Sequence, residues 1–283
     1  AGTPVLSQAI RAKLERDNQV VYGPDQIVVT CGAKQAIFNL LLALLNEGDE
    51  VIVPAPYWVS YPDMVRLADG EPAVISAGAE SGFKITPAQL EAAITDRTRA
   101  LLPVHLYGQP ADMDAILALG RARGIPVVED AAQALGSRWR GRALGTLGDA
   151  GCFSFHESKN ITCGEGGAVA IGDPELAQRA EIIREKGTNR SAFLRGEVDK
   201  YTWVGPGGSY VISDVLAALL EAGHQLPVLL SYDFEGEPRR WERLASAYAP
   251  VDYLPDNALL VIDDRQRLCG ALNMHDLLRA GVV

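Results

Sequence analysis

Lys159 and Asp130 are the two side chains of this sequence that are best placed for covalent chemistry. Lys159 stands in a turn rich in glycine and hydroxyl groups, GCFSFHESKNITCGEGG at 151–167, between two apolar stretches that read as strands. Asp130 ends the apolar run IPVVED, and a strand that ends in this way delivers its carboxylate to the carboxyl edge of a parallel sheet. A lysine amine forms Schiff bases, and a carboxylate keeps a pyridine nitrogen protonated. The pair therefore suits pyridoxal phosphate.

Gly32, Ala33 and Lys34 form a second candidate site, where the strand-like run QIVVT gives way to a helical run. The first N–H groups of a helix have no partner within it and attract an anion such as a phosphate. An ordinary strand-to-helix turn has the same pattern and stays open as an alternative. Trp58 follows a strand that ends in prolines, where an aromatic ring either stacks on a planar ligand or simply packs.

The elements that must position these residues alternate between strand and helix. The spacing predicts an opening helix through residue 17, a helix from residue 33 that ends at Gly48, and a strand over the run RALLPVHLYG at 99–108. Residues 188–208 have neither period and read as a long loop. The repeated alternation predicts an α/β fold of three layers around a mostly parallel sheet. Near the end, helices are expected over 238–248 and 274–281, and strands over 258–263 and 268–273.

The composition excludes several classes of protein. The 283 residues carry a net charge of -10, which argues against a nucleic-acid partner. The four cysteines form no CxxC pair, so we expect reduced thiols, no metal site and a cytoplasmic location. The longest apolar run, IFNLLLALL, has the length of a core helix and is too short to cross a membrane. The first residues have no basic region and no apolar signal core, so no export is expected.

Three stretches resemble known families. Residues 1–100, with YGPDQIVVTCGAKQAIFNLLLALLNEGDEVIVPAPYWVSYPDMVRLA, closely resemble class I aspartate aminotransferases. Residues 101–220, with VVEDAAQALGS, GCFSFHESKN and QRAEIIREKGTNR, resemble sugar-nucleotide aminotransferases of the dTDP-4-amino-4,6-dideoxygalactose transaminase type. Residues 255–283 look like the end of a CBS repeat of arabinose 5-phosphate isomerase. The first two resemblances imply fold type I of the pyridoxal-phosphate enzymes, with a large domain over 1–220 and a reduced, partly CBS-like C-terminal segment over 221–283.

The resemblance also implies roles for individual residues. Lys159 would form the Schiff base with pyridoxal 5'-phosphate, and Asp130 would pair with its pyridine nitrogen. The remaining cofactor contacts would be Gln133 near the 3-hydroxyl group, Ser154 at the phosphate, Trp58 against the ring, and Gly32, Ala33 and Lys34 in the phosphate turn.

The expected activity is that of an aminotransferase. An amino acid, expected to be glutamate, would give its amino group to a keto substrate, and a 4-keto-6-deoxy sugar nucleotide is favoured as that substrate. A largely cationic stretch suits a diphosphate: Arg184, Lys186, Asn189, Arg190 and Arg195. A 2-oxo acid is the alternative if residues 1–100 decide the specificity. A composite or non-catalytic chain that keeps the fold is another, and the resemblance further implies a homodimer.

Overall fold

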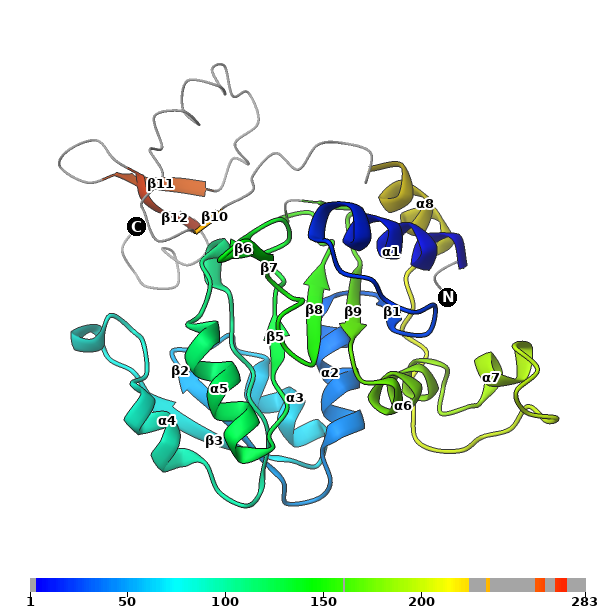
Figure 1. Ribbon diagram of the computed structural model, residues 1–283, viewed down its shortest axis with the longest axis horizontal. Helices are drawn as coiled ribbons and strands as arrows, with labels where there is room; N and C mark the ends of the chain where they lie inside the picture. Colours follow the sequence, from blue (N-terminus) through cyan, green and yellow to red (C-terminus); the bar gives the residue numbers. More distant parts are fainter. Residues whose placement is uncertain (1–3, 160, 224–232, 235–257, 263–267, 274–283) are drawn as a thin grey trace. The chain divides into compact units, whose positions relative to one another are not determined.

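The computed structural model describes residues 4–159, 161–223, 233–234, 258–262 and 268–273 (Figure 1). The chain divides into two compact units, Ala1–Asp233 and Phe234–Val283, and each is described by itself. All candidate site residues fall in the first unit. Within the described ranges, no helix is both long and apolar enough to cross a membrane.

Seven strands of the first unit form its central sheet. One group has the order β3 (Glu71–Ser76), β2 (Glu50–Ala55) and β4 (Thr98–Ala100), and all its pairs are parallel. The other has the order β1 (Ile27–Thr30), β9 (Gly167–Ile171), β8 (Ala150–Ser154) and β5 (Val128–Asp130). In this group β5 and β8 are parallel, and β9 runs antiparallel to both β8 and β1.

Two isolated β-bridges join these two groups of strands into one sheet. Leu101 pairs with Val127 and Val104 with Asp130, both in parallel, just beyond the end of β4. The resulting order is β3-β2-β4-β5-β8-β9-β1, with β9 as its antiparallel member. The prediction of a mostly parallel sheet is confirmed.

Helices cover both faces of this sheet (Figure 1). They are α1 (Pro4–Asn18), α2 (Ala33–Leu44), α3 (Tyr61–Leu67), α4 (Pro87–Ala93), α5 (Met113–Arg123), α6 (Pro174–Arg184) and α8 (Asp214–Gly223), with single 3-10 turns at Ala79–Ser81 and Leu106–Gly108, while α7 (Arg190–Leu194) packs beside α6 and away from the sheet. Side chains cap four of them, including α8, where the Ser213 hydroxyl accepts from the N–H of Leu216 at 3.3 Å. Thr86 forms a capping box with Gln89, Asp112 accepts from the N–H of Ala115, and Asp173 accepts from the second and third residues of α6.

Two hydrophobic cores lie on opposite faces of the sheet. Alternate residues of β1 separate between them, because Val28 packs in one core while Ile27 and Val29 pack in the other. The core around Val28 takes side chains from α2, α3 and α6, and the other takes them from α1, α5 and α8. Two cores on either side of one sheet make the three-layer α/β architecture that the sequence predicts.

Three expected boundaries are wrong. Helix α2 ends at Leu44, four residues before Gly48, because Leu45 is extended and the Asp49 carboxylate holds the N–H of Asn46 at 2.8 Å. Strand β4 covers only Thr98–Ala100, since the chain beyond it makes single bridges and then a 3-10 turn. The expected loop over 188–208 contains the short helix α7, whose first turn closes with a hydrogen bond from Phe193 to Asn189.

The remaining described strands are not part of the central sheet. β6 (Arg138–Trp139) and β7 (Arg142–Ala143) form a small antiparallel hairpin after β5. β10 is the pair Asp233–Phe234. In the second unit, β11 (Ala258–Ile262) and β12 (Leu268–Asn273) pair in antiparallel fashion, where strands are expected. The helices expected over 238–248 and 274–281 lie outside the described residues.

Candidate active site

The carboxyl ends of β5 and β8 bring the polar candidates together. Asp130 is the last residue of β5 and Ser154 the last of β8, and because the strands are parallel both lie at the same edge of the sheet. Both side chains are buried. The chain leaves β8 directly into the turn that carries Lys159, so this edge also receives the lysine.

Asp130 has one hydrogen-bond donor on each carboxylate oxygen. The N–H of Ala132 donates to Oδ1 at 3.0 Å, and the hydroxyl of Tyr61 donates to Oδ2 at 2.5 Å. Both donors are neutral groups. Neither hydrogen bond brings a positive charge to this buried carboxylate, so a cationic partner suits it.

Tyr61 is a site residue that the sequence reasoning missed. It is the first residue of α3, a helix that covers the sheet, whereas Asp130 lies in the sheet itself. The Tyr61 ring packs at the edge of the core around Val28. Burial, followed by the charge of Asp130, raises the pKa of its hydroxyl far above the ordinary range. Tyr61 thus stays protonated and remains a donor. Tyr61 follows Trp58 by three residues, but this spacing alone does not predict that Tyr61 contacts Asp130.

Lys159 lies half-buried in the turn between β8 and β9. Its N–H donates to the carbonyl of His156 at 2.9 Å, and the N–H of Glu157 donates to Gly164 across the turn at 2.8 Å. Burial lowers the pKa of the Lys159 amine, while the charge of Asp130 acts in the opposite direction. The charge of Asp130 therefore affects the Lys159 amine, although Asp130 ends β5 and Lys159 lies in the turn after β8.

His156 ties the lysine turn to itself. Its Nδ1 lies 2.9 Å from the Ser158 hydroxyl and accepts from the Ser158 N–H at 3.2 Å. Its Nε2 lies 3.5 Å from the carboxylate of Glu165 on the returning arm. These contacts hold together the segment from which Lys159 projects.

The predicted phosphate turn lies at the start of α2. Gly32 occupies the N-cap position in an extended conformation and supplies no side-chain cap, so the first N–H groups of α2 have no partner within the helix. The Thr30 hydroxyl donates to the carbonyl of Gly32 at 2.9 Å. The backbone of Gly167 lies against the same turn, because a Cβ built there would come within 2.3 Å of the Gly32 carbonyl carbon.

Trp58 and Gln133 have defined neighbours as well. Trp58 is half exposed, and the Nζ of Lys34 lies 5.8 Å from the centre of its ring. This contact links the two residues expected at the ring and at the phosphate. The Oε1 atom of Gln133 accepts from the N–H of Tyr107 at 2.7 Å, which leaves its amide nitrogen as the donor.

The cationic stretch expected to hold a diphosphate is largely paired with acids. Arg195 contacts Glu181 at 2.8 Å and Glu197 at 2.7 Å. Arg190 lies 3.5 Å from Glu185, which also pairs with Arg184. These charges are neutralised within the chain, so the stretch gives less support to a diphosphate than its composition does.

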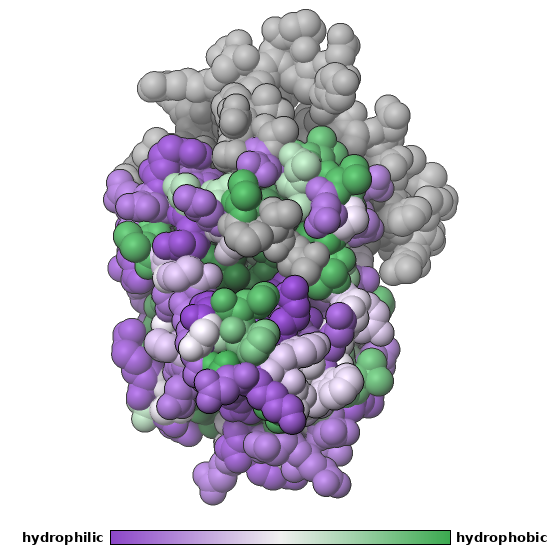
Figure 2. Space-filling view, turned by 90° about the vertical axis from the view of Figure 1, so that its right-hand side faces the viewer, coloured by the Kyte–Doolittle hydropathy of each residue, from purple (hydrophilic) through white to green (hydrophobic). Residues whose placement is uncertain are grey.

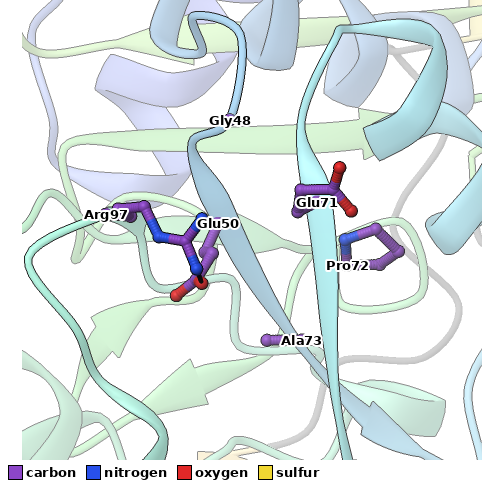
Figure 3. Close-up of a pocket in the computed structure, with 6 residues that line it drawn as sticks. All are labelled: Gly48, Glu50, Glu71, Pro72, Ala73 and Arg97. Carbon is purple, nitrogen blue, oxygen red and sulfur yellow. Dashed lines mark hydrogen bonds and ion pairs between the residues drawn. The ribbon is translucent and has the colours of Figure 1, made fainter.

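A hollow of about 330 Å³ lies elsewhere, at the amino ends of β2 and β3 (Figure 3). It is lined by Gly48, Glu50, Glu71, Pro72, Ala73 and Arg97. Figure 3 shows the Arg97 guanidinium lying against the Glu50 carboxylate, with which it forms an ion pair. The amino ends of parallel strands face away from Asp130, and the hollow is not part of the site described above.

Comparison with known proteins gives a consistent assignment. The aminotransferase from Psychrobacter cryohalolentis is 28% identical, with a TM-score of 0.67 over 78% of this chain and 56% of its own. The Bacillus subtilis protein NtdA, solved with the bound cofactor PMP, is 30% identical, with a TM-score of 0.66 over 79% of this chain and 48% of its own. DesI, solved with its TDP-sugar product, is 28% identical, with a TM-score of 0.66 over 97% of this chain and 63% of its own.

The chain thus spans less than two thirds of the length of each of these three proteins. The model of the DegT/DnrJ/EryC1/StrS aminotransferase family matches residues 10–229, which is most of the sequence and includes every candidate site residue. The chain belongs to the DegT/DnrJ/EryC1/StrS aminotransferase family.

Proposed function

We propose that the chain binds pyridoxal 5'-phosphate at the edge formed by β5 and β8. Three observations support the fit. Among the described residues, the hydrogen-bond donors to the buried Asp130 carboxylate are neutral, and a pyridinium nitrogen is a matching cation. Lys159 has an amine whose pKa is lowered by burial, which favours the neutral, nucleophilic form. Helix α2 begins without a side-chain cap, as a phosphate site requires.

Each residue has a distinct task in this proposal. Lys159 would attach the cofactor, Asp130 would hold the ring nitrogen, and the amide nitrogen of Gln133 would donate near the 3-hydroxyl group. Trp58 would lie against the ring. The phosphate is held by Ser154 together with the turn at Gly32, Ala33 and Lys34.

The proposed reaction is the transfer of an amino group. The chemistry that the cofactor supplies when bound is an electron sink for charge released at the substrate carbon. Once the amino group of the donor has displaced it from the cofactor, Lys159 would be the base that takes the proton from that carbon, and its lowered pKa brings it closer to working pH. The Asp130 carboxylate would stabilise positive charge on the ring nitrogen. The observation that carries the proposal is geometric: Asp130, Ser154 and the turn with Lys159 meet at one edge of the sheet.

A 4-keto-6-deoxy sugar nucleotide is our proposed acceptor, with glutamate as the amino donor. Family membership and the likeness to DesI, solved with a TDP-sugar, support a sugar substrate. The paired arginines of 184–195 do not add to that support. A 2-oxo acid is the alternative acceptor, because residues 1–100 resemble class I aspartate aminotransferases. This resemblance and that of residues 255–283 to a CBS repeat stay predictions. A non-catalytic or composite chain is the remaining alternative.

Labelling of the lysine tests the cofactor site. Purified protein with pyridoxal phosphate is expected to gain a visible absorption band, and borohydride followed by peptide mapping should place the label on Lys159. Lys159→Ala should remove both band and label, while Lys84→Ala, at an exposed lysine, should keep them. Label spread over several lysines would rule the proposal out. Turnover of glutamate with keto-sugar nucleotides, compared with 2-oxo acids, then separates the two acceptors.

We further propose a homodimer in the cytoplasm, without nucleic-acid or membrane partners. The face that holds α7 and α8 carries groups of hydrophobic side chains among polar ones (Figure 2). The exposed apolar residues of 193–219 include Trp203 and Val215, with 76% and 78% of their surface accessible. Such exposure suits a protein interface. A sedimentation experiment showing only monomers would contradict the dimer.

The division into a large domain, 1–220, and a small segment, 221–283, also remains a proposal.

A further inference from the structure

The contact between Tyr61 and Asp130 joins two distant parts of the chain. Tyr61 opens α3, which follows β2, whereas Asp130 ends β5. Their hydrogen bond spans 69 positions of sequence and has a length of 2.5 Å. The phenol thus reaches the carboxylate that is proposed to hold the ring nitrogen.

The two donors on Asp130 fix the plane of its carboxylate. Ala132 donates to Oδ1 from the backbone just after the strand, so this contact depends only on the local chain. Tyr61 donates to Oδ2 from a different layer, so this contact depends on the packing of α3. One local donor leaves the carboxylate free to rotate about its bond, whereas two donors hold it in one orientation.

Tyr61 is suited to remain a donor. Its hydroxyl group is shielded by burial and faces a negative charge, and both effects raise its pKa. It therefore stays protonated at working pH and cannot itself act as a base. Its hydrogen bond also stabilises the ionised form of Asp130, and because Tyr61 is neutral it does not replace the positively charged ring nitrogen as the partner of Asp130.

We propose that Tyr61 is a positioning residue, which orients the Asp130 carboxylate toward the cofactor's ring nitrogen and keeps the proton on that nitrogen. This inference rests on the proposed function. Without the Tyr61 donor, the carboxylate rotates more freely and attracts the ring proton more strongly. Both changes weaken the pairing between Asp130 and the ring.

Tyr61→Phe tests this role in the cofactor-loaded protein. The dissociation constant of pyridoxal phosphate is expected to rise on the order of tenfold, as for the loss of one hydrogen bond to a charged group. With ¹⁵N-labelled cofactor, the ring-nitrogen resonance should move toward that of an unprotonated pyridine. The control is Tyr57→Phe, since Tyr57 is exposed and its hydroxyl has no hydrogen-bond partner among the described residues. An unchanged dissociation constant and resonance in Tyr61→Phe would overturn the inference.

A double-mutant cycle in the full chain without cofactor separates this inference from the proposed function. Tyr61→Phe is expected to lower the free energy of unfolding, and by clearly less when Asp130→Asn is already present. Equal losses in both backgrounds mean that the two side chains do not interact, which overturns the inference. If the cycle shows coupling but the wild type takes up no cofactor at Lys159, the contact stands while the proposed function fails, and with it the role toward the ring.

Discussion

Glu129 and Asp130 are consecutive residues of β5, and their two carboxylates have separate and very different partners. Asp130 meets Tyr61 and the N–H of Ala132 at the candidate site. Glu129 points to the other face of the sheet, where it is completely buried. It contacts His105 Nε2 at 2.8 Å. One strand end therefore carries one carboxylate for the site and one for the interior.

The partners of Glu129 explain its burial. Three backbone N–H groups donate to it, from Gly145 at 2.8 Å, Leu147 at 2.6 Å and Gly148 at 2.8 Å. His105 accepts from the N–H of Ala111 through Nδ1, which leaves Nε2 to donate to Glu129. Glu129 thus ties the loop after the β6–β7 hairpin to β5.

Glu129→Gln is expected to destabilise the protein by about 2–4 kcal/mol, because the amide nitrogen would face N–H donors that need an acceptor. Chemical denaturation of the full chain measures the change. The matched control is Glu91→Gln, since Glu91 is exposed and pairs with Arg123 at the surface. That change should stay within about 0.5 kcal/mol. Equal effects of the two substitutions would mean that the buried network contributes nothing to stability.

Gly167→Ala is expected to displace the turn at the start of α2. The added Cβ would lie 2.3 Å from the carbonyl carbon of Gly32 and 2.6 Å from the nitrogen of Ala33, and both are backbone atoms. We expect a loss of about 1–3 kcal/mol in stability, as for overpacking, together with weaker binding of pyridoxal phosphate.

Gly205→Ala is the control for this substitution, because among the described residues other than its chain neighbours no atom lies within 4 Å of a Cβ built at Gly205. Denaturation and cofactor titration of both variants provide the comparison. A Gly167→Ala protein that binds the cofactor as the wild type does would show that the turn at Gly32 is not part of its site.

Lys13 makes the stability depend on pH. It is buried, its Nζ donates to Asn18 at 2.7 Å, and burial lowers its pKa from 10.5 to about 8. Between these values the unfolded lysine holds a proton that the folded one has released. The free energy of unfolding therefore rises with pH across this window. Below about pH 8 the lysine is charged in both states, and the folded protein carries the full destabilisation from burying that charge.

Lys13→Met should remove this dependence. The stability of the wild type relative to the variant is expected to increase by about 3 kcal/mol between pH 8 and 10.5. Denaturation midpoints at several pH values give this difference, and Lys84→Met, at an exposed lysine, controls for the loss of one amine. A difference that stays constant with pH would refute the prediction.

Local signals in the sequence predict the layers of the fold and single out two candidate residues, whose roles toward a cofactor stay predictions. Asp130 and Lys159 could be singled out because each stands at the end of an apolar run or in a glycine-rich turn, and the alternation of strands and helices predicts the layers. Glu129 was not recognised, although it is next to Asp130. Only the packing of the loop at 145–148 distinguishes a buried carboxylate from an exposed one in the run VVED.

Contacts between distant segments could not be predicted in the same way. Nothing in the spacing of Tyr61 connects it with Asp130, because the contact depends on how α3 packs on the sheet. The composition of 184–195 predicts a largely cationic stretch, yet Arg195 pairs with Glu181 on α6 and with Glu197. The end of α2 depends on a capping contact of Asp49, which a helical period does not reveal.

Trp58 gives a test of ring stacking that is independent of Lys159. If its indole stacks on the cofactor, Trp58→Ala should raise the dissociation constant of pyridoxal phosphate by roughly fivefold to tenfold, the effect of losing one aromatic pair, while Trp58→Phe should keep most of the affinity. Lys34→Met separates the two contacts of the indole, because the Lys34 amine lies 5.8 Å from the ring centre. If Lys34 only steadies the indole, this variant should have a smaller effect than Trp58→Ala. Equal affinity in Trp58→Ala and wild type would show that Trp58 is a surface residue with no part in binding.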